Sequence, residues 1–174
     1  MDMYCCSEED ARYVGAFYNQ TVLTLIERKL NYPKWVLGGY PSEDSAVEAI
    51  SRQAQYMCVD DDWIVGAFVL DDDPEQTYLQ ASWPLDLKQG EYLVIHALAV
   101  NPDLWGKGIG TEMVAWCAEE AMRRGCKALR TDTAPDNAPA DALYLSCGFE
   151  KVGESDLGRD IEGLSTFSLF ELAL

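Results

Sequence analysis

A glycine-rich turn between an apolar segment and an amphipathic segment constrains this chain more than any other feature. Tyr92–Val100 is almost entirely apolar, which is typical of a strand covered on both faces. Gly106, Gly108 and Gly110 follow, and apolar residues then recur at helical spacing over about 111–124. Alternating glycines let backbone N–H groups converge, and a helix start adds unpaired N–H groups and a positive dipole end. The sequence therefore predicts a strand, a turn that suits a phosphate or pyrophosphate, and a helix.

Two common phosphate-binding motifs do not fit this turn. Lys107 is followed by Gly108 rather than by Ser or Thr, which excludes the P-loop pattern. Met113 stands where the dinucleotide fingerprint has its third glycine. A glycine turn also serves as a simple tight connection, so a phosphate site and a purely structural turn both stay open at this point.

The residues on either side of the turn carry a resemblance to a known family. Before and through the turn the chain reads Leu98-Ala99-Val100-Asn101-Pro102 and then Gly106-Lys107-Gly108-Ile109-Gly110. Downstream, a pattern of the form Asn-x-x-Ala-x-x-Leu-Tyr-x-x-x-Gly-Phe is matched in register by Asn137, Ala140, Leu143, Tyr144, Gly148 and Phe149. With both motifs in this order, the chain resembles the GNAT superfamily of acyl-CoA-dependent N-acetyltransferases, most closely over residues 92–153. One position departs from the family pattern: Trp105 stands where the family has Arg or Gln.

The resemblance implies an α/β (α+β) fold. We expect one GNAT-like domain over residues 1–174, with a mixed, mostly antiparallel central sheet flanked by helices. In this family a splayed central strand pair forms the acetyl-CoA cleft. The alternating strand and helix patterns of the chain independently favour a single sheet domain. Residues 75–91 fit no clear pattern, and we expect a short strand and a loop there.

The resemblance also implies a set of residues that bind acetyl-CoA, the co-substrate. The Gly106–Thr111 backbone would hold the pyrophosphate, with Lys107 as the only cation in the turn, and the end of the preceding strand would pair with the pantetheine arm. The cofactor-binding residues implied in this way are Leu98, Ala99, Val100, Gly106, Lys107, Gly108, Ile109, Gly110, Thr111, Asn137 and Tyr144. Asn137 is equally well explained as a helix cap, and Leu98 and Val100 as core strand residues.

Two residues are candidates for proton transfer. Tyr144 matches the family's tyrosine beside the CoA sulfur and would act as a general acid; otherwise it is a packing tyrosine on a helix. His96 is the candidate general base, and the arylalkylamine acetyltransferase branch has a histidine at the matching place in His-Ala-Leu-Ala-Val. A histidine satisfied inside the sheet is the equally weighted alternative. Strand alternation puts His96 and Leu98 on one face, although a bulge can re-aim either.

Composition limits the classes of partner. The formal net charge of −17 argues against nucleic acid. It would attract a cationic amine, although solubility alone is the more common reason for such a charge. No apolar run approaches 18 residues, so we expect no membrane span. The N-terminus lacks a basic region, so we expect no signal peptide. Six scattered cysteines and one histidine predict a reduced, cytoplasmic protein without a zinc or other metal site.

The acceptor is expected to be a small-molecule or peptide amine, since residues 30–42 and 75–91, which would line it, carry no interpretable motif. An enzyme of this fold using a longer acyl-CoA or another acceptor is a second hypothesis. A catalytically silent CoA-binding or interaction module of the same fold is the alternative from a different class. The terminal strand, about 166–172, could pair across a homodimer.

Overall fold

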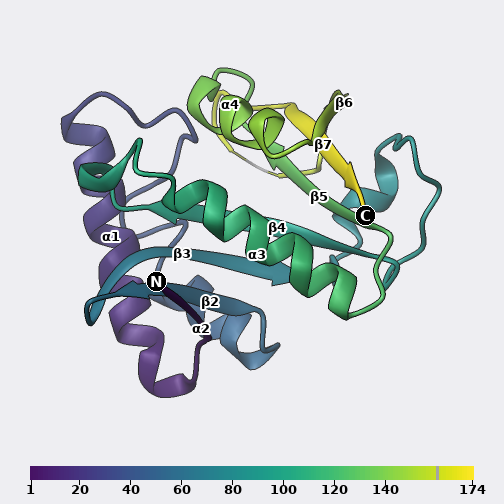
Figure 1. Ribbon diagram of the computed structural model, residues 1–174. Coiled ribbons are helices and arrows are strands. Elements are labelled where there is room, and N and C mark those ends of the chain that lie inside the picture. Colours follow the sequence, from purple (N-terminus) through teal and green to yellow (C-terminus); the bar gives the residue numbers. More distant parts are fainter. Residues whose placement is uncertain (160) are drawn as a thin grey trace. The chain divides into compact units, whose positions relative to one another are not determined.

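The computed structural model describes residues 1–159 and 161–174, and its strands form one mixed sheet. The strand order is β1-β2-β3-β4-β5-β7-β6 (Figure 1). The β4–β5 pair is parallel, whereas β1–β2, β2–β3, β5–β7 and β6–β7 are antiparallel. The expected mixed, mostly antiparallel sheet is therefore confirmed.

The elements follow the expected order along the chain. The strands are β1 (Asp2–Cys5), β2 (Gln55–Asp60), β3 (Trp63–Asp71), β4 (Tyr92–Val100), β5 (Ala128–Thr133), β6 (Glu150–Ser155) and β7 (Phe167–Ala173). The α-helices are α1 (Ala11–Glu27), α2 (Glu43–Ser51), α3 (Ile109–Arg123) and α4 (Ala138–Ser146). Short 3₁₀ helices cover Glu8–Asp10, Thr77–Gln80 and Pro102–Leu104. The strand Tyr92–Val100 has the bounds expected from sequence, and the helix after the glycine turn begins two residues earlier than expected.

The expectation of a short strand within residues 75–91 is wrong. A 3₁₀ helix, Thr77–Gln80, stands there instead. The Asp73 carboxylate accepts hydrogen bonds from the backbone N–H groups of Thr77 (2.9 Å) and Tyr78 (2.8 Å). This local side-chain partner satisfies backbone donors that a strand would have directed to a neighbouring strand.

The chain divides into two compact units that are each discontinuous in sequence. The first unit comprises Met1–Leu70 and Ala97–Met113, and the second comprises Asp71–His96 and Val114–Leu174. Strand β4 contributes to both, because the division falls between His96 and Ala97. Each unit is described by itself below.

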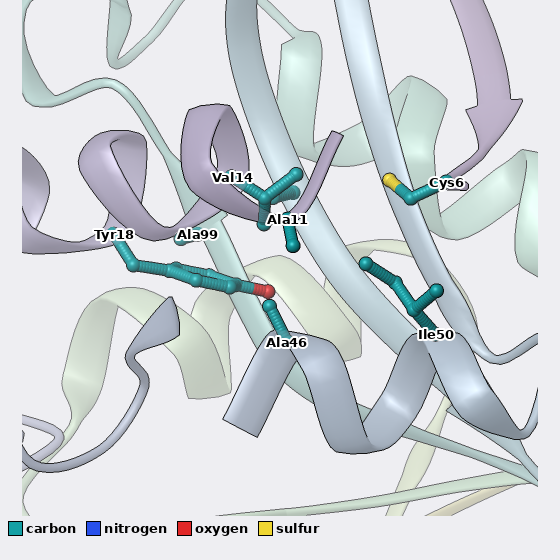
Figure 2. Packing of buried hydrophobic residues seen from close by; sticks show 8 residues of the cluster. Cys6, Ala11, Val14, Tyr18, Ala46, Ile50 and Ala99 are labelled. Atoms are coloured by element: carbon teal, nitrogen blue, oxygen red, sulfur yellow. The ribbon is translucent and has the colours of Figure 1, made fainter. Parts of the chain in front are cut away.

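The core of the first unit joins α1 and α2 to the sheet residues beneath them. One buried cluster contains Cys6, Ala11, Val14, Tyr18, Ala46, Ile50, Ala67 and Ala99. In Figure 2 the Tyr18 hydroxyl of α1 points toward Ala46 of α2. The helices approach closely at Gly15, where a Cβ atom would lie 2.5 Å from Glu43 Cβ. Glycine is therefore required at this crossing by the space available.

In the second unit the parallel pairing of β4 with β5 is short. Tyr92–Ile95 pairs with Ala128–Thr131, and the register stops there although both strands continue. The parallel pairing within the second unit therefore ends at Ile95 and Thr131. Continuing the register places His96 opposite Asp132, with both side chains on one face, because opposite residues of a parallel pair share a face.

The segment between β3 and β4 covers that face of the second unit. A buried cluster joins Tyr78 of this segment to Tyr92, Val94 and Ala128 of the strands. Beside it the guanidinium of Arg130 stacks over the rings of Tyr92 and Trp83, at 4.1 Å and 4.3 Å. The segment that sequence patterns left unassigned is thus a cover for the paired part of β4 and β5.

Strand β7 lies inside the sheet, hydrogen-bonded to β5 on one side and to β6 on the other. Both of its edges are therefore occupied within the chain. The expectation that β7 pairs across a homodimer is therefore wrong, because both of its edges already pair within the chain. That the chain forms a homodimer stays a prediction.

Three further findings concern the cysteines, the possible metal ligands and the length of the helices. All six cysteines are free thiols, and Cys117 is buried, as expected. Within residues 1–159 and 161–174, no group of His, Cys, Asp or Glu is arranged to hold a metal ion. No helix in that same part of the chain has the length and apolarity to cross a bilayer.

Candidate active site

The glycine turn of the first unit presents open backbone. Gly106 and Gly108 have φ angles of +79° and +85°, in the left-handed region that favours glycine. A Cβ atom at either residue would meet nothing within 4 Å. The glycines therefore serve the backbone conformation, and no neighbouring atom requires the absence of a side chain at Gly106 or Gly108.

The N–H groups of this turn are mostly uncommitted. Lys107 N donates to Leu104 O (3.4 Å) and Glu112 N to Gly108 O (3.0 Å). Among the residues that the structure describes, no acceptor pairs with the N–H groups of Gly106, Gly108, Ile109, Gly110 and Thr111. The last three belong to the first turn of α3, where the positive end of the helix dipole lies. Five unpaired donors beside a helix start form a suitable anion site.

Contacts just before the turn fix its position in the first unit. Asn101 N donates to Val65 O of β3 (2.9 Å), and the Asn101 side chain accepts from Asp103 N (3.0 Å). Arg28, after α1, pairs with the Asp103 carboxylate at 2.5 Å. The turn is thus tied to β3 and to α1, so that its donors are held in place before a ligand arrives.

Trp105 has a structural role that the sequence did not indicate. Its indole Nε1 donates to the carbonyl of Val100, the last residue of β4, at 3.1 Å. The ring is 41% exposed at the edge of the turn. Trp105, which departs from the family pattern, therefore binds the last residue of β4 through a hydrogen bond. The exposed Lys107 is left as the side-chain cation of the turn.

Strand β4 is irregular where it passes from one unit to the other. Ala97 has φ +48°, a left-handed conformation that residues with a Cβ rarely adopt. Beyond it Ala99 is buried, whereas Leu98 and Val100 are partly exposed. The alternation of side chains between the two faces of β4 therefore cannot be extended across Ala97. The sequence left open an irregularity of this kind, which can re-aim His96 or Leu98. Strained residues of this kind concentrate at functional sites.

Tyr144 lies in the core of the second unit. It is 4% exposed, and its ring packs near Phe149 and Phe170 at centroid distances of 5.3 Å and 5.9 Å. Burial raises the pKa of its phenol above the ordinary value, and hydrogen bonding with Thr131 opposes this only in part. Tyr144 is therefore a neutral proton donor at every physiological pH, and it also packs.

Asn137 caps the helix that carries Tyr144. Its side-chain oxygen accepts from Ala140 N at 3.4 Å, at the start of α4. The capping role that the sequence left open is thus present in the structure. The carboxamide remains partly exposed.

His96 lies at the point where the parallel pairing ends. Its Nε2 is 3.5 Å from Asp71 Oδ1, and its ring meets the ring of Tyr78 edge-on at a centroid distance of 5.8 Å. The side chain is 20% exposed. His96 is therefore neither fully buried nor fully open, and it has a carboxylate at one nitrogen, an arrangement that suits a base.

A second group of residues in this region was not found from sequence. The Tyr78 hydroxyl donates to the Asp132 carboxylate, and Arg159 binds the same carboxylate with both terminal nitrogens, at 2.6 Å and 2.8 Å. The available signal was an acidic residue at the carboxyl end of a parallel strand, a place where ligands commonly bind.

The predicted residues thus form two groups. The first unit brings together the turn residues 106–111 and the end of β4, residues 98–100. The second unit contains His96, Asn137 and Tyr144. Thr131, the hydrogen-bonding neighbour of Tyr144, donates its hydroxyl to Ile95 O (3.0 Å), one residue before His96.

Comparison with known proteins identifies related sequences. Residues 21–149 match the family described as the acetyltransferase (GNAT) family. An S-(2-succino)cysteine N-acetyltransferase of Bacillus subtilis is 28% identical over 120 residues, which are 67% of this chain and 66% of that protein. An uncharacterized N-acetyltransferase of Methanocaldococcus jannaschii is 31% identical over 70 residues, 40% of this chain and 31% of its length. The chain therefore matches less than two thirds of either relative's length.

Solved structures share the fold at low sequence identity. A GNAT-family acetyltransferase of Listeria monocytogenes is 15% identical with a TM-score of 0.77, over 99% of this chain and 94% of that one. A ribosomal-protein-alanine N-acetyltransferase of Brucella melitensis is 18% identical with a TM-score of 0.73, over 100% of both chains. A Salmonella typhimurium protein described as an acetyltransferase, solved with its cofactor acetyl-CoA, is 17% identical with a TM-score of 0.72, over 100% and 94%.

Proposed function

Because the chain belongs to the acetyltransferase (GNAT) family, we propose that it transfers the acetyl group of acetyl-CoA to a primary amine of a small molecule or peptide. The observation that carries this proposal is the row of unpaired N–H donors at Gly106 and Gly108–Thr111. Backbone donors at a helix start bind phosphate groups without a side-chain cation. The donors are adjacent along the turn and lack acceptors among the described residues, so the residues present fit a pyrophosphate.

Acetyl-CoA supplies the activated acetyl group, held as a thioester. The side chains of the second unit would manage protons. His96 would accept a proton from the acceptor ammonium, so that the amine nitrogen has a free electron pair to attack the acetyl carbonyl carbon. As the new C–N bond forms, the C–S bond breaks. Tyr144, neutral because burial raises its pKa, would give its proton to the departing thiolate. The nitrogen releases its second proton to the base or to solvent, and the products are an N-acetyl amine and CoA.

The irregular part of β4 would serve the acetyl carbonyl. Left-handed backbone at Ala97 reorients the peptide groups between His96 and Leu98. A backbone N–H aimed at a developing oxyanion is worth roughly 3–4 kcal/mol of barrier lowering in other enzymes. We assign this role to main-chain groups of residues 97–100, which would account for a strained conformation at a residue with a Cβ atom.

The acceptor class follows from two observations. The net charge of −17 raises the local concentration of cations, which favours an ammonium-bearing acceptor. Two of the relatives are named for amine acceptors, S-(2-succino)cysteine and the alanine of a ribosomal protein. The six free thiols fit a reducing compartment, and we place the activity in the cytoplasm.

A second candidate function is a catalytically silent CoA-binding module. Two observations favour it: Trp105 replaces the family's Arg or Gln, and the Tyr144 hydroxyl is buried among Thr131 and aromatic rings. In this alternative the turn binds CoA but no amine is acetylated. The presence of His96 beside a carboxylate, partly exposed, favours the enzyme.

The test is thermal unfolding with acetyl-CoA, with NADH and ATP in parallel, followed by release of free thiol in the presence of amines. A ligand at about 100 times its dissociation constant adds roughly 2.7 kcal/mol to folding stability, which gives a clear upward shift. We expect a shift with acetyl-CoA alone and thiol release with at least one primary amine. A shift without thiol release from any amine would support the silent module, and no shift would reject the CoA site.

A further inference from the structure

Tyr78 and Asp132, from separate parts of the second unit, are linked to the candidate base on one face of the sheet. His96 and Asp132 occupy equivalent positions directly after the last residues in parallel register, Ile95 and Thr131. Tyr78 bridges them, since its ring meets His96 at 5.8 Å and its hydroxyl donates to Asp132. The base is therefore in contact with a polar group that also includes the end of β5.

Tyr78 is held on every side. It is fully buried, its N–H donates to Asp73 (2.8 Å), and its carbonyl accepts from the indole of Trp83 (2.8 Å), whose ring stacks on the phenol at 5.3 Å. Burial and the Asp132 charge raise the pKa of the Tyr78 phenol, so it stays a neutral donor. Because the Tyr78 ring is held in one position, it can restrict the orientation of the His96 imidazole that it contacts.

The anchor of Tyr78 is itself connected to the chain between β6 and β7. Arg159 binds both oxygens of the Asp132 carboxylate, and its guanidinium lies 4.7 Å from the Phe167 ring centre. The Asp132 side chain is 8% exposed, whereas that of Arg159 is 30% exposed. The carboxylate is thus the buried partner, and the arginine approaches it from the outer side.

We propose that Tyr78 and Asp132 are positioning residues for His96 and that Arg159 ties the connection between β6 and β7 to this alignment. The inference rests on the proposed function, because it gives His96 the role of base. Asp71 at Nε2 and the Tyr78 ring together would hold the imidazole in one orientation. A change in the position of Arg159 would pass to the base through a carboxylate and a phenol.

The chain offers a matched control for this proposal. Two residues earlier on β5 and on the same face, Arg130 pairs with Glu171 at 2.8 Å and donates to Leu85 O at 2.7 Å. This pair is also buried and also fastens the segment between β3 and β4. It has no contact with His96 among the interactions of the described residues. Arg130 reaches Tyr78 through the stacked ring of Trp83. Breaking the pair therefore tests the loss of a buried ion pair that leaves the Tyr78–Asp132–Arg159 hydrogen bonds in place.

The experiment uses the fact that the chain has a single histidine. Its imidazole signals in a proton–carbon NMR spectrum therefore need no assignment, and no substrate is required. We compare the full chain with Tyr78→Phe, Asp132→Asn, Arg159→Gln and the control Glu171→Gln. Each is followed over about pH 5–9, where histidine changes charge. Thermal unfolding establishes that each variant folds.

We expect Tyr78→Phe to displace and broaden the imidazole signals, because the ring remains but loses its anchor. Of the charged groups in this region, Asp71 lies 3.5 Å from the imidazole, whereas Asp132 and Arg159 are linked to it through Tyr78. Asp132→Asn and Arg159→Gln should also displace the imidazole signals, because each removes hydrogen bonds of the carboxylate that anchors the Tyr78 ring. Glu171→Gln should leave the signals in place. If Asp132→Asn fails to fold, Tyr78→Phe decides the question.

Turnover supplies the second readout. With an amine found by thiol release, kcat of Tyr78→Phe should fall roughly tenfold, with KM for acetyl-CoA unchanged. The loss should vanish in a His96→Gln background. Unmoved imidazole signals, or moved signals with unchanged kcat, would overturn the proposal. Absence of acetyl transfer by the unmodified chain would reject the proposed function instead, and the spectra would still decide the alignment.

Discussion

The glycine turn of the first unit and the polar group around His96 in the second unit are built from opposite materials. The turn consists of backbone N–H groups that lack partners among the described residues. The group around His96 consists of buried and partly buried side chains that are joined to one another by hydrogen bonds and ion pairs. The two sites should therefore be sensitive to different substitutions. Added bulk or charge should disrupt the turn, whereas loss of a single side-chain atom should disrupt the group around His96.

The largest expected effect is an added charge in the turn. Gly108→Asp should weaken acetyl-CoA binding by roughly 100-fold, because a carboxylate near a phosphate costs on the order of several kcal/mol at low effective dielectric. Asp tolerates a positive φ better than most residues, so the fold should survive. Binding is measured by isothermal titration calorimetry.

Gly90→Asp is the matched control for this change. Gly90 has φ +83°, against +85° for Gly108, and a Cβ atom there also meets nothing within 4 Å. The same residue type and charge are therefore introduced at an equally open site in the second unit. Equal affinity losses in both variants would mean that net charge, and not the turn, controls binding.

The next effect concerns the buried acid. Tyr144→Phe should lower kcat by roughly one to two orders of magnitude, since proton transfer by a positioned group contributes about that much or more. Burial raises the pKa of Tyr144, so the group stays protonated at assay pH. The loss should therefore be the same factor from about pH 6 to pH 9, where an unperturbed phenol is also mostly protonated. The measurement is kcat against pH, with acetyl-CoA affinity as the control.

A loss that shrinks toward alkaline pH would contradict this assignment, because it would mean that Tyr144 loses its proton within the assay range and the unmodified chain loses its acid. Unchanged turnover would leave Tyr144 as a packing residue beside Phe149 and Phe170. In that case the first unit would contribute a binding turn, whereas Tyr144 would contribute only packing to the second unit.

The same difference in material explains what the sequence could predict. The turn is encoded by missing side chains at adjacent positions, so glycine spacing predicts it, and the apolar run before it predicts β4 with its observed bounds. Tyr144 was found because its motif is local to one helix. By contrast, Tyr78 and Asp132 are separated by 54 residues and Asp132 and Arg159 by 27. No local pattern records such pairs.

Two further features of the fold could not be predicted from residue propensities or from the alternation of apolar and polar residues. The segment before β4 lacks strand periodicity because it is shaped by particular partners, the Asp73 carboxylate and the Arg130 guanidinium. Left-handed backbone at Ala97 has no signal in the sequence, since alanine does not favour it. Tertiary contacts impose both, and both lie close to His96 in the chain or in space.

The smallest expected effect tests whether the turn acts through backbone alone. Trp105→Phe keeps an aromatic ring but removes the donor to Val100 O. One hydrogen bond at a partly exposed site contributes about 1 kcal/mol, so acetyl-CoA affinity should fall by roughly threefold to fivefold through a looser turn. Trp105→Gln keeps a side-chain donor and should stay closer to the unmodified chain.

Both variants are compared by calorimetry with acetyl-CoA and with CoA. A loss near 100-fold in Trp105→Phe would mean that the indole contacts the ligand itself. The turn would then depend on a side chain as the His96 group does, and the contrast between the two units would not hold. A loss confined to a few-fold, with Lys107 unchanged, supports a site in which main-chain N–H groups do the binding and Trp105 only holds them in place.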